Sequence, residues 1–81
     1  MAEEIAAMRA RLGLLADELT YRSRALEDSE LRLLIAETPV ADADRHRAIE
    51  GFRLVRTQVE ALERQLEALE REDQTRAGAG P

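Results

Sequence analysis

The feature that most constrains the fold is a heptad repeat that occupies both halves of the chain. Such a repeat places apolar residues alternately four and three positions apart, at the a and d positions of a coiled coil. In the first half these residues are Ile5, Met8, Leu12, Leu15, Leu19, Leu26 and Leu33, with Arg22 and Ser29 interrupting the row. In the second half they are Ala48, Phe52, Val55, Val59, Leu62, Leu66 and Leu69. The sequence therefore predicts an all-α fold with two long helices.

The two rows are separated by a short segment that contains Pro39. Because the residue before a proline is displaced from helical backbone angles, the first helix should end before this point. We expect a first helix at about 3–37, a turn within about 38–42 and a second helix at about 39–73. Thr38 can cap the second helix, with Pro39 at its first position, or Asp42 can be the cap; we favour Thr38. Residues 1–74 then form one hairpin, and the small, polar residues 75–81 are expected to form a disordered tail.

Folding the chain back on itself predicts which residues meet across the seam. We expect an antiparallel coiled coil in which opposed residues have numbers that add up to 81, so that Arg22 lies opposite Val59 and Leu19 opposite Leu62. This register also sets opposite charges against each other. Glu27, Asp28 and Glu30 face Arg53 and Arg56, Arg9 and Arg11 face Glu70 and Glu72, and Glu18 faces Arg64.

Composition limits the class of protein. The chain has 81 residues, a net charge of −5 and no cysteine, so it forms at most one small domain without disulfides or thiolate metal sites. The negative charge argues against nucleic-acid binding. No apolar run reaches the ~18 residues that a membrane span needs, and the acidic N-terminus is unlike a signal peptide. We expect a soluble, cytoplasmic protein that does not bind membranes.

A second set of apolar residues lies off the seam. Since one seam is a small core for a chain of this length, and exposed apolar rows often mark protein interfaces, we expect this set to be covered. Two hairpins can pack into a four-helix bundle, which we favour, or a helix of another protein can lie on the row. The interface candidates are Leu14, Tyr21, Leu31, Leu34, Ile35 and Leu54, with Ala7, Ala61 and Ala68 extending the row.

Residues suited to catalysis or metal binding are few. His46 is the only histidine, and a carboxylate four positions on, Glu50, is a weak signal for a metal site, so we interpret His46 as a solvated side chain and predict no metal site. The carboxylates lie along charged stripes, and no nucleophile motif or phosphate-binding loop is present, so we predict no enzymatic activity.

The segment 21–24 is unusual because Arg22 occupies a seam position. One interpretation is structural: the stem of Arg22 lies along Leu19 and Leu26 and its guanidinium reaches Glu18 or Glu63. The other is functional, since arginine side chains bind phosphate and carboxylate groups well. The candidates for such an anion site are Thr20, Tyr21, Arg22 and Arg24.

The same segment carries a family resemblance. Residues 18–26, Glu-Leu-Thr-Tyr-Arg-Ser-Arg-Ala-Leu, continuing to Ile-Ala-Glu at 35–37, resemble the first helix of actinobacterial anti-sigma factors of the RsiG type. The resemblance implies a two-helix antiparallel coiled coil that holds a sigma factor with cyclic di-GMP as cofactor. Aligned through the shared Leu-Thr-Tyr-Arg, the family's ligand-binding serine falls on Thr20. Its glutamate, arginine, glutamine and aspartate fall on Ala16, Ser23, Glu27 and Leu31.

From these patterns we expect a small non-enzymatic adaptor or regulator that binds another protein through a helical face. Sequestration of a sigma factor is its most concrete form. The alternative is a structural subunit of a larger assembly, such as a phage particle, a secretion apparatus or a division complex. We expect no cofactor from the residues themselves, and cyclic di-GMP is the candidate that the resemblance supplies.

Overall fold

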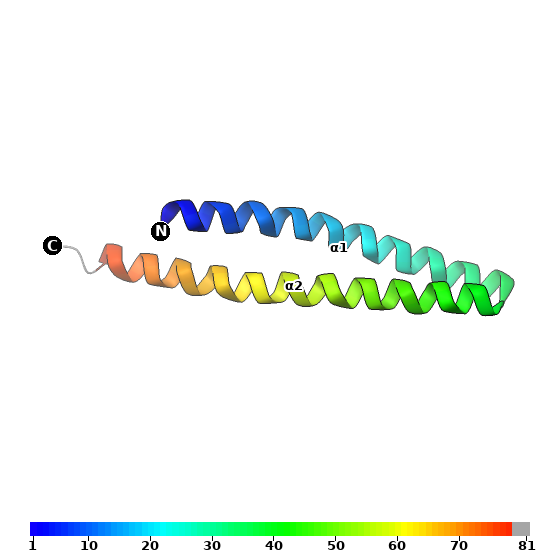
Figure 1. Cartoon of the computed structure of the whole chain (residues 1–81). Helices are drawn as coiled ribbons and strands as arrows, with labels where there is room; N and C mark the ends of the chain where they lie inside the picture. Colours follow the sequence, from blue (N-terminus) through cyan, green and yellow to red (C-terminus); the bar gives the residue numbers. More distant parts are fainter. Residues whose placement is uncertain (79–81) are drawn as a thin grey trace.

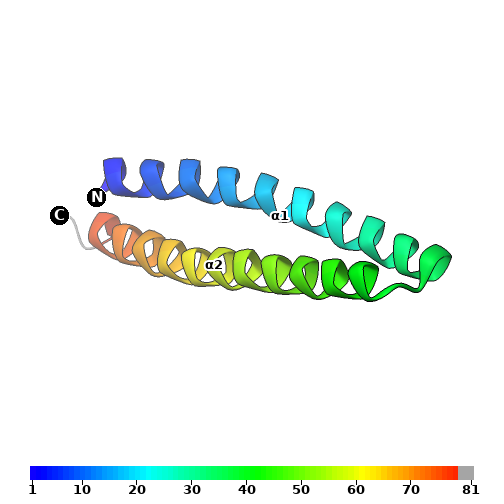
Figure 2. The ribbon, with the colours of Figure 1, turned by 45° about the vertical axis from the view of Figure 1, so that its right-hand side comes forward.

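The protein is a two-helix antiparallel hairpin, as the heptad repeat predicts. A computed structural model describes residues 1–78, which form α1 (Ala2–Ala36) and α2 (Pro39–Gly78). The helices run side by side in opposite directions over almost their whole length (Figures 1 and 2). The resulting rod measures 67 × 14 × 13 Å between Cα atoms. No helix within residues 1–78 combines the length and apolarity needed to cross a membrane.

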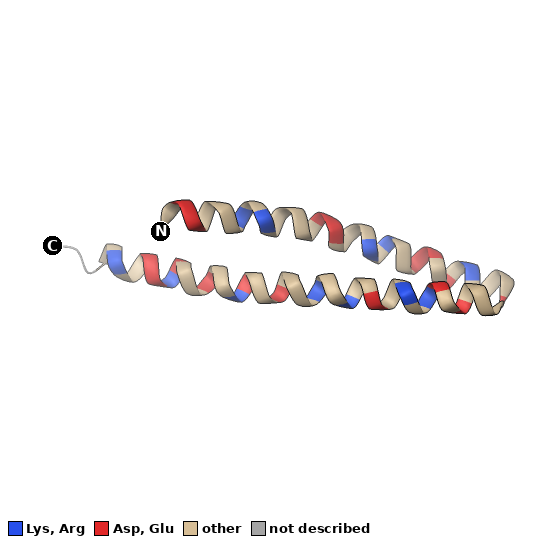
Figure 3. Cartoon of the chain, viewed as in Figure 1, with Lys and Arg blue, Asp and Glu red and all other residues tan. Residues whose placement is uncertain are grey.

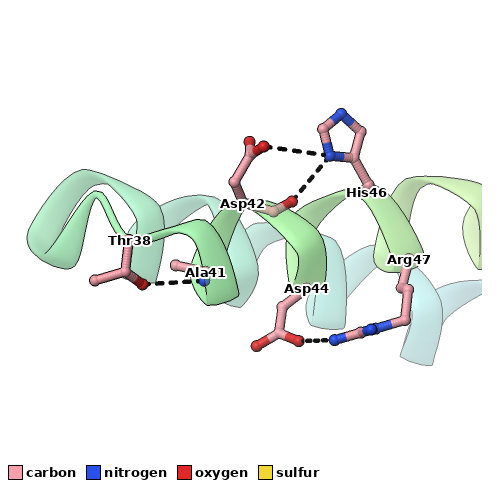
Figure 4. A network of polar contacts seen from close by, with 6 residues as sticks. All are labelled: Thr38, Ala41, Asp42, Asp44, His46 and Arg47. Carbon is pink, nitrogen blue, oxygen red and sulfur yellow. Dashed lines mark hydrogen bonds and ion pairs between the residues drawn. The ribbon is translucent and has the colours of Figure 1, made fainter.

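The turn consists of only two residues, Glu37 and Thr38. Glu37 ends α1 in the left-handed conformation, with φ 36° and ψ 45°, and its N–H donates to the Leu33 carbonyl at 2.9 Å. The Thr38 hydroxyl then accepts a hydrogen bond from the N–H of Ala41 at 3.1 Å (Figure 4). Thr38 is therefore the cap of α2 and Pro39 its first helical residue, the arrangement that suits a residue without an N–H.

The far end of α2 is longer than the sequence predicted. The helix continues to Gly78, five residues beyond Asp73, and extends past the N-terminus of α1 (Figure 1). The prediction of a tail from residue 75 is thus wrong for 75–78. Local bonds support the extension: Arg76 pairs with Glu72 at 3.2 Å, and the Thr75 hydroxyl donates to the Arg71 carbonyl at 2.9 Å. Residues 79–81 lie outside the described part of the chain.

The heptad positions form the core, as predicted. Every predicted a and d residue of both helices is buried or half-buried, including the two that interrupt the apolar row, Arg22 and Ser29. Ser29 is buried because its hydroxyl donates to the Leu26 carbonyl at 2.7 Å, which satisfies the polar group within the helix. The most buried apolar residues are Ile5, Ala41, Val55, Val59, Leu62 and Leu66.

The register differs from the prediction by one heptad. Because α1 ends at Ala36 and α2 begins at Pro39, residues at equal height have numbers that add up to about 75. The nearest register that keeps a opposite d adds up to 74, which brings Arg22 level with Phe52 instead of Val59. Consistent with this, a Cβ placed on Gly51 would lie 3.1 Å from Nη1 of Arg22. The predicted register of 81 is wrong because it required a longer turn.

The change of register also removes most of the predicted charge pairs. Charged residues line both helices (Figure 3), but between the helices the described residues form one ion pair, Arg9 with Glu70 at 3.6 Å. The other ion pairs join residues of the same helix. Arg56, for example, binds Glu60 at 2.9 Å, not an acidic residue of α1. Apolar contact in the seam therefore holds the hairpin together.

Candidate protein-interaction faces

The interface candidates are the most exposed large apolar side chains of the molecule. Their exposed fractions run from 57% for Leu31 to 87% for Ile35. Val40, 70% exposed, joins them. The sequence interpretation missed it because Val40 was assigned to the turn, although it follows the same spacing on α2 as Leu54. The full set is Leu14, Tyr21, Leu31, Leu34, Ile35, Val40 and Leu54.

These residues lie on two faces that share Ile35. With Ile5 as an a position, Leu34 is at b and Leu31 at f, the positions that point away from the partner helix. Leu14, Tyr21 and Ile35 are at c, which adjoins the g positions along the side of the seam. On α2, with Phe52 as an a position, Val40 and Leu54 are at c. In an antiparallel pair the g positions of the two helices face each other, so the two c rows flank one side of the hairpin.

The first face is a cluster of Leu31, Leu34 and Ile35 near the end of α1, which we call the turn-end cluster. These residues are three and four positions apart and therefore adjoin on the helix surface. The charged neighbours of the two leucines at the same spacing are acidic, whereas the one charged neighbour of Ile35 at this spacing is Arg32. Glu27 and Glu30 precede the two leucines by four positions, and Glu37 follows Leu34 by three. None of these three carboxylates forms an ion pair within residues 1–78.

The second face contains both c rows and the g residues between them, and we call it the paired face. Each c residue of α1 lies level with a c residue of α2, at the same distance along the rod from the turn. The numbers of the two residues in each such pair add up to 75, the value fixed by the turn. Tyr21 lies level with Leu54, and Ile35 with Val40. Further along, Leu14 lies level with Ala61 and Ala7 with Ala68. The remaining pair is charged and consists of Asp28 and Arg47.

A shallow groove of about 210 Å³ opens on the paired face. Ala61 lies at its edge, and the small Ala61 side chain leaves room beside Leu15 and Leu62 of the seam. Arg11, Gln58 and Gln65 complete the lining. The groove is therefore apolar at its base and polar at its rim, which suits an aliphatic side chain of another helix.

The anion-site candidates do not converge. Thr20 and Arg24 line an open groove of about 410 Å³ with Glu27, whereas Tyr21 lines a different one, with Arg24 and Asp28. Arg22 takes part in neither. Its guanidinium lies over Gly51 and pairs with Glu18 at 3.4 Å, as the structural interpretation predicted. A buried Arg22 Nε has no hydrogen-bond partner among the described residues. Arg24 lines both grooves, and Arg32 joins Tyr21 and Arg24 in the second, so the four candidates do not form a single site.

His46 lies at the surface near the turn. Its Nδ1 donates to the Asp42 carbonyl at 3.0 Å and lies 3.6 Å from the Asp42 carboxylate (Figure 4). Arg47 pairs with Asp44 on the next side of the helix. Within residues 1–78 no group of three or more His, Asp or Glu side chains is placed to hold a metal ion. These polar contacts lie between residues three or four positions apart and stabilise the first turns of α2.

Comparisons of the chain with protein-family models, with curated proteins and with solved structures find no match.

Proposed function

We propose that this protein is a non-enzymatic adaptor that binds another protein through the turn-end cluster. One observation carries the proposal: within residues 1–78, seven large apolar side chains are more than half exposed. A hairpin held by a single seam leaves its outer faces free, and contiguous exposed apolar residues are characteristic of protein interfaces. Leu31, Leu34 and Ile35 present the i, i+3, i+4 pattern with which one helix anchors another.

The charges around the cluster indicate the chemistry of the partner. Glu27, Glu30 and Glu37 surround the leucines and have no cationic partner within residues 1–78. A helix with an apolar stripe flanked by Arg or Lys would bury the leucines and pair with these carboxylates. Rim charges of this kind chiefly raise the rate of association and make it sensitive to salt. The proposed partner is therefore a protein with a basic amphipathic helix.

A regulatory role is the form of this function that we favour. An adaptor that covers such a helix withholds it from its other contacts, which is how a sequestering anti-sigma factor acts. The resemblance of residues 18–26 to RsiG-type proteins supports a sigma factor as that partner and a cytoplasmic location. If the partner proves to be a stoichiometric component of a larger particle, the protein is a structural subunit instead.

Site-specific photocrosslinking in the native cells tests the proposal. A benzoylphenylalanine placed at Leu34 should give one dominant crosslinked species, because Leu34 is 76% exposed within the cluster. The matched control carries the same group at Arg64, an exposed f position of α2 with no large apolar neighbour on its outer face. The substitution Leu31→Glu should abolish the Leu34 crosslink. Equal labelling from Leu34 and Arg64, or a Leu34 crosslink that survives Leu31→Glu, contradicts the proposal.

A further inference from the structure

We infer that the paired face binds a second copy of the hairpin, and that the two copies lie parallel, with their turns at the same end. This contact shares only Ile35 with the turn-end cluster, since it uses the c rows, whereas Leu31 and Leu34 occupy f and b. The c rows of α1 and α2 match each other in height and in chemistry. This match predicts the orientation of the second copy as well as its binding.

Two hairpins that pack face to face are related by a two-fold axis that lies in the interface. If this axis runs along the rod, α1 of one copy faces α2 of the other at the same height. Each c residue of α1 then meets its level partner on α2 of the second copy. Tyr21 meets Leu54, Leu14 meets Ala61 and Ile35 meets Val40, so every apolar residue faces an apolar residue.

Charged residues also occupy g positions of this face, but among the c positions there is one charged pair, and it selects this orientation. In the parallel dimer Asp28 of each copy faces Arg47 of the other copy, so the two-fold axis gives two such pairs. If the axis instead runs across the rod, α1 faces α1. Every other c position of α1 is Ala, Leu, Tyr or Ile. Asp28 would therefore face either an apolar residue or a second Asp28, in any register that keeps c positions level. Asp28 already shares a groove with Arg24 and Arg32 of its own helix. The parallel arrangement adds Arg47 of the second copy, whereas the other arrangement buries the carboxylate against an apolar residue or a second carboxylate, which is costly.

The shape of the paired face agrees with this arrangement. In the parallel dimer Leu14 of one copy lies above Ala61 of the other, at the groove of about 210 Å³. A leucine over an alanine allows one helix to approach the other closely, as knobs-into-holes packing requires. Beside Tyr21 and Leu54, the g positions on the side towards the turn are Ala25 and Gly51, which leave the two larger side chains as ridges there, and those on the other side are Glu18 and Gln58.

The area available is enough for a stable dimer. The rod is 67 Å long and 14 Å wide between Cα atoms, so one face offers on the order of 900 Å² per copy. A stable protein interface buries about 800 Å² per partner. The product is a four-helix bundle in which Leu31 and Leu34 still point outward. Leu31 and Leu34 therefore remain open to a different partner protein when a second copy covers the paired face, which includes Ile35.

Light scattering from about 1 to 500 µM tests self-association. The wild-type chain should be a dimer, and Leu14→Glu should raise its dissociation constant at least tenfold. Leu14 is 72% exposed in the hairpin, so circular dichroism should show unchanged helicity. Tyr21→Glu is a second variant with the same expected effect. Leu34→Glu, equally exposed but at a b position, is the matched control and should leave the dimer intact. A monomeric wild type, or a dimer indifferent to both variants, overturns the inference.

Orientation is tested with cysteines, because the chain has none of its own. A Leu14→Cys chain mixed with a size-tagged Ala61→Cys chain should form the mixed disulfide on mild oxidation. Leu14→Cys alone should give little, since the two Leu14 positions lie on opposite edges of a parallel dimer. Asp28→Arg should weaken the dimer, and the double variant Asp28→Arg/Arg47→Asp should restore it. Preferential Leu14–Leu14 crosslinking, or no rescue, refutes the parallel arrangement.

Loss of self-association and loss of the proposed adaptor function are distinguishable. Leu14→Glu should split the dimer and preserve the photocrosslink from Leu34. Leu31→Glu should abolish that photocrosslink and preserve the dimer. If either substitution abolishes both contacts while the helices remain folded, the assignment of the two contacts to separate faces is wrong.

Discussion

Removing the Thr38 hydroxyl should destabilise the hairpin by about 1 kcal/mol, the typical value for a lost helix cap. The hydroxyl accepts the N–H of Ala41 at 3.1 Å, and Pro39 has no N–H that needs a partner. In Thr38→Ala, the Ala41 N–H therefore loses its partner at the start of α2. For a chain of this size, 1 kcal/mol corresponds to a fall in melting temperature of about 4–8 °C.

Three matched variants isolate the cause. Thr38→Val keeps the branched shape without the acceptor and should behave like Thr38→Ala. Thr38→Asp supplies an acceptor and a negative charge at the N-terminus of α2, so its stability should be close to that of the wild type. Asp42→Ala removes a carboxylate that pairs only with exposed His46, at 3.6 Å, and should cost less than Thr38→Ala.

The assay is urea unfolding followed by circular dichroism at one fixed protein concentration, because self-association would make stability depend on concentration. The decisive comparison is between Thr38→Ala and Asp42→Ala. If Asp42→Ala is the more destabilising, Asp42 is the cap and the turn is longer than two residues. That result would also refute the register derived from the turn.

Other predictions concern the turn, the helix interior, the seam and the ligand hypothesis. Glu37→Gly should stabilise the hairpin by about 0.5–1 kcal/mol in urea unfolding, because Glu37 has φ 36°. Gly13→Ala should give a similar gain, since a Cβ there meets nothing within 4 Å; a loss in either case contradicts the local geometry. Leu66→Ala should cost about 2–3 kcal/mol, whereas Glu70→Gln should cost less than about 0.5 kcal/mol, and comparable losses would mean that charges hold the seam. Cyclic di-GMP should leave the melting temperature unchanged in a thermal-shift assay, and a rise that Arg24→Ala abolishes would reinstate the anion site.

Local sequence signals correctly placed the elements of this fold. The alternating spacing from Ile5 to Leu33 and from Ala48 to Leu69 identified the seam residues, because a left-handed coiled coil buries the a and d positions whatever their partners are. Thr38 followed by Pro39 located the start of α2. The exposed candidates followed by elimination, since large apolar residues outside the seam have nothing to cover them in a two-helix fold.

The boundaries that depend on weak local preferences were less accurate. The small, polar residues after Gln74 resemble a tail in composition, yet α2 continues through them to Gly78. Once a long helix exists, each added residue costs little, because propagation does not repeat the cost of nucleation. Val40 was likewise missed as an exposed apolar residue because it lies within the first turn of α2.

The sequence alone determined that the chain forms two helices, which residues face the seam and which large apolar residues stay exposed. Only the tertiary structure decided how the helices are aligned, because a heptad pattern looks the same after a shift of seven residues. Two registers set a positions opposite d positions: one in which the numbers of opposed residues add up to 81, and one in which they add up to 74. The first leaves Ile5 opposite Arg76, whereas the second sets it opposite Leu69. The two-residue turn permits the second register, and Ile5 is accordingly buried. That same turn sets Tyr21 level with Leu54 and Asp28 level with Arg47. The paired face is therefore a consequence of chain closure that heptad spacing could not reveal.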